Sequence, residues 1–200
     1  MKNKMLLIGL GLLIGLLGFT QSSSACVGRI LYIGAMDTPE SKLMAELLVT
    51  LINERTGTNV KIRFANNRTD LYTAFKSHDE NSRIDVIVEN TGDAMAHQRK
   101  SRMNSADQEY AELKKTYEKE LEMVWLTPFA FKTGSGPVPS LSAPVIRQDV
   151  LTNFPLLPRI LNKLSTAIDT QTYNDLLGKV KSSGKPKNVA KDFLRERKFI

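Results

Sequence analysis

The sequence predicts an α/β protein with a mostly parallel, doubly wound sheet, helices on both faces and a helical C-terminal tail. Two observations support this fold class. Short apolar strands alternate with helical stretches as far as residue 126, and the chain beyond residue 142 has only helical patterns. The length left after residue 25 suits one domain with its own core rather than two.

The alternation depends on buried strands and capped helices. Apolar runs predict strands at residues 29–34, 60–64, 84–88 and 123–126. Asp37-Thr38-Pro39-Glu40 is typical of a helix start, apolar residues recur at helical spacing from Leu43 to Ile52, and Gly57 ends that helix. Further helices are expected at residues 69–77 and 105–120.

Residues 132–142 break the pattern with glycine, proline and serine, which predicts a loop or crossover. After it, four helices are expected, at residues 145–154, 156–167, 171–180 and 188–197. The domain prediction is therefore a single lobe over residues 26–200.

Residues 1–25 have the pattern of an export signal. Lys2 and Lys4 precede an uncharged apolar run that is too short for a comfortable membrane span, and small polar residues follow it. Signal peptidase could cut after Ala25, or Cys26 could be acylated as in a lipoprotein, or the segment could stay as an uncleaved anchor. Each outcome places residues 27 onward outside the inner membrane. Since Cys26 is the only cysteine, an internal disulfide is excluded.

The composition argues against several functions. Removal of residues 1–25, which hold two lysines and no acidic residue, changes the net charge from +7 to +5, and this positive charge in an exported chain favours an anionic membrane surface or an acidic partner over nucleic acid. His78 and His97 have no metal-ligand spacing, and the chain lacks nucleophile-elbow, phosphate-loop and dinucleotide motifs. We therefore expect no enzyme activity, no metal and no cofactor.

Several segments of the chain carry a family likeness, which is strongest in the tail, at residues 143–151, 154–157, 161–164, 168–176 and 187–194, and extends upstream to residues 84–92, residues 124–126 and Pro128. In these segments the chain resembles the substrate-binding proteins of glycine betaine/choline-type (osmoprotectant) ABC transporters. Residues 84–92 occupy the place of a family segment that ends Tyr-Pro-Glu-Tyr-Thr-Gly, and residues 124–126 with Pro128 resemble the strand that leads toward the family's hinge. The resemblance implies one lobe of a periplasmic-binding-protein (type II) fold.

The chain departs from the family pattern in two respects. Family members have a second lobe where this chain has residues 132–142, so these residues would be a short crossover that replaces it. A family segment Tyr-Pro-Glu-Tyr-Thr-Gly is here Ile87-Val88-Glu89-Asn90-Thr91-Gly92, and Ser140 lies in a segment that also lacks the family's tyrosine. Aromatic faces contribute about 0.5–2 kcal/mol each to holding a quaternary ammonium group, so their loss weakens the case for glycine betaine itself.

Ligands of open parallel α/β sheets bind beyond the carboxyl ends of the strands. This rule selects polar residues that follow each predicted strand, and the resemblance favours those around Glu89. The predicted ligand-binding residues are Asp37, Thr38, Asn66, Arg68, Glu89, Asn90, Thr91 and Ser140, with Glu40, Phe129 and Phe131 nearby. An alternative is that Asp37 or Thr38, Asn66 to Arg68, and Glu89 with Asn90 only start helices.

These observations lead to one functional hypothesis and one rival. The chain would be the exported solute-binding component of an ABC transport system, located in the periplasm or at the outer face of the inner membrane. Its partners would be a membrane permease and a small polar or zwitterionic solute, with a homo-oligomer or another chain supplying a second wall. Alternatively, the lobe is an envelope scaffold that has lost solute binding.

Overall fold

The computed structural model describes residues 29–134, 137–182 and 184–200. The predicted signal peptide and Cys26 lie outside these residues. The buried hydrophobic core runs from Leu31 to Leu194, so the chain after the predicted signal contains its own core. Among the described residues, none of the helices has both the length and the apolar character that crossing a membrane requires.

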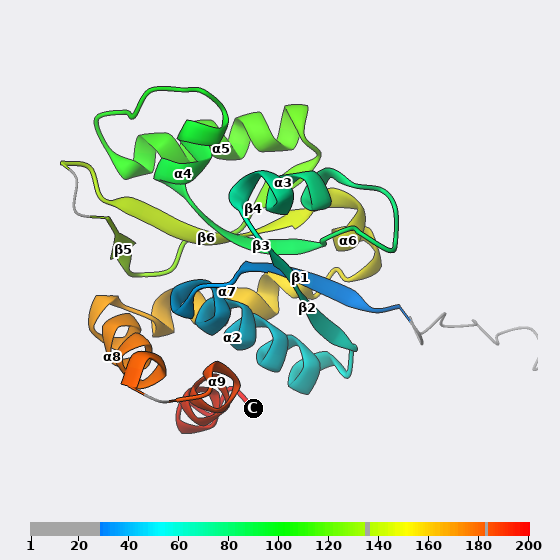
Figure 1. Cartoon of the computed structure of the whole chain (residues 1–200), viewed down its shortest axis with the longest axis vertical. Helices are drawn as coiled ribbons and strands as arrows, with labels where there is room; N and C mark the ends of the chain where they lie inside the picture. The colour runs from blue at the N-terminus through cyan, green and yellow to red at the C-terminus, as the bar shows by residue number, and fades with distance from the viewer. Residues whose placement is uncertain (1–28, 135–136, 183) are drawn as a thin grey trace, which may run out of the picture.

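The strands of the described residues form one mixed sheet in the order β2-β1-β3-β6-β4, with β5 paired to β6 (Figure 1). β1 is parallel to β2 and β3, whereas β6 is antiparallel to both β3 and β4. Consequently β1 to β4 run in one direction, and β6 runs against them, which confirms the mostly parallel α/β prediction. The strands are β1 (Leu31–Met36), β2 (Val60–Ala65), β3 (Val86–Asn90), β4 (Met123–Trp125), β5 (Lys132–Thr133) and β6 (Ser140–Arg147).

Helices cover both faces of the sheet, as predicted (Figure 1). One apolar cluster packs α2 and the C-terminal helices against one face, and a second packs α3, α4 and α5 against the other. The helices are α2 (Pro39–Thr56), α3 (Arg68–Lys76), α4 (Thr91–His97), α5 (Ala106–Glu120), α6 (Gln148–Asn153), α7 (Leu157–Ala167), α8 (Thr170–Ser182) and α9 (Pro186–Glu196).

Local capping chemistry fixes where the helices beside the site begin. The Thr38 hydroxyl accepts the Ser41 N–H at 3.2 Å, Pro39 follows, and Gly57 ends α2 at φ 69°. Asn67 caps α3 by accepting the Asp70 N–H at 2.8 Å. Both helix starts face the carboxyl ends of β1 and β3, where the site is found.

The helix predicted for residues 145–154 is wrong in its first part. Val145, Ile146 and Arg147 end β6, and the helix α6 begins only at Gln148. β6 is buried along its whole length between β3 and β4. A short apolar run that is buried on both faces has no strand periodicity, so the pattern cannot distinguish it from a buried helix.

The two ends of the predicted loop at residues 132–142 are strands. Lys132 pairs with Leu141, and Thr133 pairs with Ser140, in an antiparallel arrangement of β5 and β6. The segment therefore supplies the start of a sheet strand.

Candidate functional site

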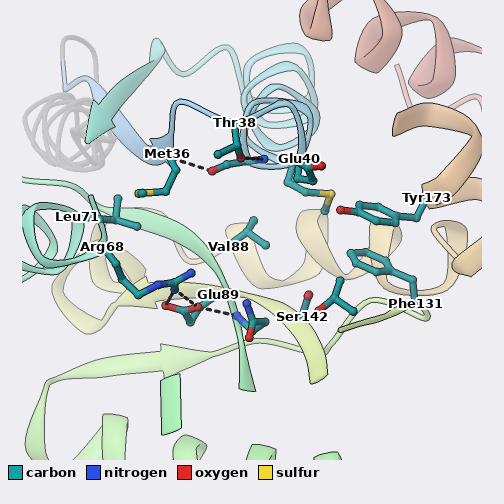
Figure 2. Close-up of a pocket in the computed structure, with 14 residues that line it drawn as sticks. Met36, Thr38, Glu40, Arg68, Leu71, Val88, Glu89, Phe131, Ser142 and Tyr173 are labelled. Carbon is teal, nitrogen blue, oxygen red and sulfur yellow. Dashed lines mark hydrogen bonds and ion pairs between the residues drawn. The ribbon is translucent and has the colours of Figure 1, made fainter. Parts of the chain in front are cut away.

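A pocket of about 350 Å³ lies at the carboxyl ends of β1 and β3 (Figure 2). This is where the strand-end rule places the ligand of an open α/β sheet. Its walls come from the start of α2, the start of α3, the β3–α4 junction, β5, β6 and α8. The lining residues are Met36, Thr38, Glu40, Ser41, Met44, Arg68, Leu71, Val88, Glu89, Asn90, Phe131, Thr133, Ser142 and Tyr173.

One side of the pocket presents a guanidinium group held by carboxylates. Arg68, the first residue of α3, donates from Nη1 to both Glu89 oxygens at 2.7 and 2.9 Å, and its Nη2 pairs with Asp93. Glu89 also accepts the Tyr72 hydroxyl at 2.6 Å and the Asn90 N–H at 2.8 Å. The Glu89 side chain is 1% exposed and that of Arg68 38%, so Arg68 is the group that can meet a solute.

The ionisation of this pair follows from its surroundings. Burial raises the pKa of the Glu89 carboxyl, and the hydrogen bonds from Arg68, Tyr72 and the Asn90 N–H offset this only in part. Burial lowers the pKa of Arg68, but the charges of Glu89 and Asp93 outweigh it and raise that pKa above its ordinary value. The guanidinium is therefore a permanent cation at the pocket wall.

The opposite side of the pocket is aromatic (Figure 2). Phe131 and Tyr173 stack with ring centroids 4.1 Å apart and planes 5° apart, and Phe129 stacks with Phe131 at a centroid distance of 5.5 Å. A β-bridge between Ala130 and Asp169 joins the start of α8 to this segment and so positions Tyr173. Burial and the nearby Glu40 carboxylate raise the pKa of Tyr173, so its hydroxyl stays protonated.

Apolar side chains connect these two sides. Met36 and Leu71 lie toward Arg68, and Val88 lies between the two walls (Figure 2). The pocket thus combines a fixed cation, an apolar middle, and an aromatic wall with Glu40 beside it. Such an arrangement can hold a small molecule that carries a negative group at one end and a positive or apolar group at the other.

Four of the eight predicted site residues line this pocket: Thr38, Arg68, Glu89 and Asn90. Two of them also cap helices, which is the alternative interpretation that the sequence offers for them. Thr38 caps α2, and Asn90 caps α4 by accepting the Asp93 N–H at 2.8 Å. Half of the predicted residues therefore fall on this candidate pocket, although several of its polar groups already have internal partners.

The other four predicted residues lie outside the pocket lining. Asp37 is 74% exposed and pairs with Lys42, and Asn66 is exposed beyond the edge strand β2. Thr91 is fully buried and accepts the Leu141 N–H at 3.3 Å. Ser140 is buried and accepts the Gly92 N–H at 3.1 Å, a close approach in which a Cβ on Gly92 would lie 2.5 Å from the Ser140 oxygen.

Sequence reasoning missed Met36, Met44, Ser142 and Tyr173. The sequence pattern places Tyr173 only in a helix of the tail, and its aromatic character is the signal that marks it as a candidate for the site. The Ser142 hydroxyl makes no hydrogen bond to a described residue and lines the pocket, so it is available to a solute. Within the described parts of the chain, no group of His, Cys, Asp and Glu side chains could hold a metal ion.

Comparison with known families decides what kind of protein has this site. A family model described as "Substrate binding domain of ABC-type glycine betaine transport system" matches residues 31–138 and 132–196. The chain belongs to this family. The two matched segments meet within residues 132–138, at the start of the expected crossover. A search of the curated proteins finds no match to the chain.

Solved structures support the same fold. Apo YehZ from Escherichia coli superposes with a TM-score of 0.74 at 13% identity, over 86% of this chain and 100% of that one. The crystal structure of a glycine betaine/carnitine/choline ABC transporter superposes with a TM-score of 0.75 at 13% identity, over 84% of this chain and 99% of that one. Lactococcal OpuAC in its closed form with glycine betaine superposes with a TM-score of 0.50 at 9% identity, over 85% of this chain and 96% of that one.

Membership of the family establishes the general role. Substrate-binding proteins of ABC transporters bind small solutes outside the cytoplasm, work with membrane permease components and are not enzymes. The prediction of a non-catalytic, solute-binding α/β lobe of this family is confirmed.

Proposed function

We propose that the pocket binds a small zwitterionic solute of the betaine or carnitine kind. The observation that supports this most is the position of Arg68 opposite the stacked Phe131 and Tyr173 (Figure 2). The solute's carboxylate would meet the guanidinium, and its quaternary ammonium group would lie against the aromatic wall beside Glu40, which also pairs with Lys181 at 2.7 Å.

The geometry of Arg68 suits this role. Its bonds to Glu89 and Asp93 use Nη1 and Nη2, and they leave Nε–H and the remaining N–H groups without a described partner. A planar guanidinium that is already held in place loses little side-chain entropy when it binds a carboxylate. An aromatic face adds about 0.5–2 kcal/mol for the cation, depending on how well water is excluded.

The transport setting is part of the same proposal. Residues 1–25 direct export, and the lobe of residues 26–200 works in the periplasm or, if Cys26 is acylated, tethered to the outer face of the inner membrane. A permease of the ABC type receives the solute. With residues 132–142 in place of a second lobe, the pocket has an open side, so a second copy of the chain or another protein supplies the opposing wall and raises the affinity.

A scaffold that has lost solute binding is the second candidate, and one observation favours it. Both Glu89 oxygens and the Asn90 amide are occupied by internal hydrogen bonds, as expected for groups that only support the fold.

Thermal unfolding of residues 27–200 against a panel of solutes separates the two candidates. The panel contains glycine betaine, proline betaine, carnitine, choline, amino acids and polyamines. A solute at a hundred times its dissociation constant adds about 2.7 kcal/mol, which moves the midpoint by several degrees. We expect a saturable shift with the zwitterions and a smaller one with choline, which has no carboxylate.

Two variants test the assignment of Arg68. Arg68→Gln should abolish the zwitterion shift and leave any choline shift, whereas Arg159→Gln, which removes an exposed arginine from α7, should leave both. A flat response of the unsubstituted chain across the panel would favour the scaffold and overturn the solute proposal.

A further inference from the structure

The positive charge of this chain is concentrated in twenty residues. Residues 179–198 hold eight Lys and Arg against two Asp and Glu, a net charge of +6. Residues 29–178 hold 18 basic against 19 acidic residues, a net charge of −1. The positive charge of the described fold therefore belongs to the end of α8, the connection after it, and α9. These eight residues, here the C-terminal basic segment, are Lys179, Lys181, Lys185, Lys187, Lys191, Arg195, Arg197 and Lys198.

The C-terminal basic segment lies at one outer edge of the molecule. Figure 1 shows α8 and α9 together there, outside α2. Lys187, Lys191 and Arg195 follow one another at four-residue spacing, which places them on one face of α9. All members except Lys191 are exposed. Seven of the eight charges are therefore open to solvent at this edge.

Acidic groups of the neighbouring α2 neutralise only part of this surface. Lys181 pairs with Glu40 at 2.7 Å, and Lys191 lies 3.8 Å from Glu54. Glu46, also on α2, faces Lys187 at longer range, and Arg197 faces Asp169. Lys179, Lys185, Arg195 and Lys198 form no ion pair with a described residue. An excess of cations therefore remains for an external partner.

The opposite side of α9 is already occupied. Val189, Ala190, Phe193 and Leu194 are buried against the core, in the same cluster as α2. The segment thus offers an outer charged layer and no apolar face for a partner helix or for insertion into a bilayer. A stable protein interface usually has an apolar centre, whereas an anionic lipid surface is recognised by charge alone, so this segment fits a lipid surface better than an acidic protein.

We propose that the C-terminal basic segment docks the protein on an anionic lipid surface. Clusters of about four to eight Lys and Arg on a helix bind anionic headgroups, and each side chain near the surface contributes about 1 kcal/mol. The pocket stays accessible in this arrangement, because α8 contributes only Tyr173, from its first turn, and α9 contributes nothing to the pocket lining. Lys181 of the segment pairs with the pocket residue Glu40, so one of the docking charges lies beside the pocket.

Vesicle sedimentation of residues 27–200, which lack Cys26 and hence any acyl anchor, tests the proposal. Vesicles of phosphatidylcholine containing phosphatidylglycerol should bind the protein, and pure phosphatidylcholine should not. Binding should weaken as salt is raised. Binding equal on both vesicle types, or binding to neither, would overturn the proposal.

Charge reversal locates the contact. A triple variant should weaken vesicle binding by at least about a hundredfold, because each lost cation lowers the affinity about fivefold. It combines Lys179→Glu, Lys187→Glu and Arg195→Glu. The matched control reverses Lys114, Lys115 and Lys119, which are exposed on α5 and change the net charge equally. Equal loss in the control would overturn the assignment to α8 and α9. Binding to soluble polyglutamate without binding to anionic vesicles would show an acidic-protein site and contradict the lipid surface.

Discussion

Arg68 and Glu89 form an ion pair in which the carboxylate is buried and the guanidinium faces the pocket. The pair joins the first residue of α3 to the end of β3, with Nη1 2.7 and 2.9 Å from the two Glu89 oxygens. Because Tyr72 and the Asn90 N–H complete the shell of Glu89, its carboxylate has no lone pair directed at a solute. Glu89 acts through Arg68, by holding it in place.

Glu89→Gln tests this relation, because it keeps the shape of the side chain and removes its charge. We expect the free energy of unfolding to fall by about 3 kcal/mol. This is the lower end of the range for breaking a buried ion pair, because Arg68 keeps some contact with water. Asp93→Asn, which changes the half-exposed partner of Arg68, should cost under about 1 kcal/mol. Urea denaturation measures both values. Equal losses from the two variants would contradict the central role of Glu89.

Gly34 is expected to tolerate no larger residue. A Cβ there would lie 2.7 Å from Ile84 and 2.8 Å from Leu71, where α3 packs on β1. Gly34→Ala should therefore destabilise the fold by about 1–3 kcal/mol through overpacking. Gly178→Ala is the matched control, because a Cβ at Gly178 meets nothing within 4 Å.

The two alanine substitutions should act in opposite directions. Gly178 lies within α8, so its replacement should stabilise the protein by about 0.5–1 kcal/mol through helix propensity. Denaturant midpoints of the two variants give the comparison. Similar midpoints for both would mean that α3 can move away from β1 without loss.

The fold was predictable where the sequence contains local signals. Thr38-Pro39 and Gly57 marked both ends of α2 because caps depend on neighbouring residues only. β6 was not predictable in the same way: Val145 and Ile146 are extended because β3 and β4 flank them, and that depends on residues far away in the chain. The order of the sheet, with β6 between β3 and β4, follows from the same distant pairing.

The candidate site was half predictable for a related reason. The strand-end rule found Thr38 and Glu89, since β1 and β3 are neighbours and their ends meet. It also found Arg68, which follows β2 but reaches Glu89 as the first residue of α3. It misplaced Asn66, because β2 is an edge strand whose end lies away from the pocket. It missed Tyr173, which reaches the pocket through the packing of α8 beside residue 130.

Trp125 offers a test of core packing. It is 1% exposed, with Tyr110 and Tyr117 packed edge-on at 6.0 and 5.5 Å, and its Nε1–H has no hydrogen-bond partner among the described residues. Trp125→Ala should cost about 3–5 kcal/mol. Trp125→Phe should cost under about 1.5 kcal/mol, because it leaves a smaller cavity and removes the unpaired donor.

Circular dichroism in urea measures both tryptophan variants without relying on tryptophan fluorescence. If Trp125→Phe proved as damaging as Trp125→Ala, the indole N–H would have to be bonded in solution, for example to a buried water.

Acid should weaken the fold through Glu109, whose carboxylate is buried under the loop before α5. Burial raises the pKa of Glu109, but Arg102, the Met103 N–H at 3.0 Å and Thr91 outweigh it and hold the pKa below its usual 4.5. The Arg102 guanidinium also donates to the Val138 carbonyl at 2.7 Å. By holding Arg102, Glu109 therefore also fixes the chain segment that leads into β6.

The sign of the pH effect follows from the lowered pKa. Below pH 4.5 the unfolded chain takes up a proton at Glu109 before the folded chain does, so this contribution to stability is complete above that pH and is lost as the pH falls through the folded pKa. Glu109→Gln should therefore lower stability at neutral pH and flatten its decline in acid. Urea denaturation from neutral to acidic pH measures this, with Glu118→Gln as the control, since Glu118 is exposed on the same helix and has no ion pair with a described residue. If Glu109→Gln declined in acid as steeply as the unsubstituted chain, other carboxylates would govern the acid response and the Arg102 contact would contribute nothing to it.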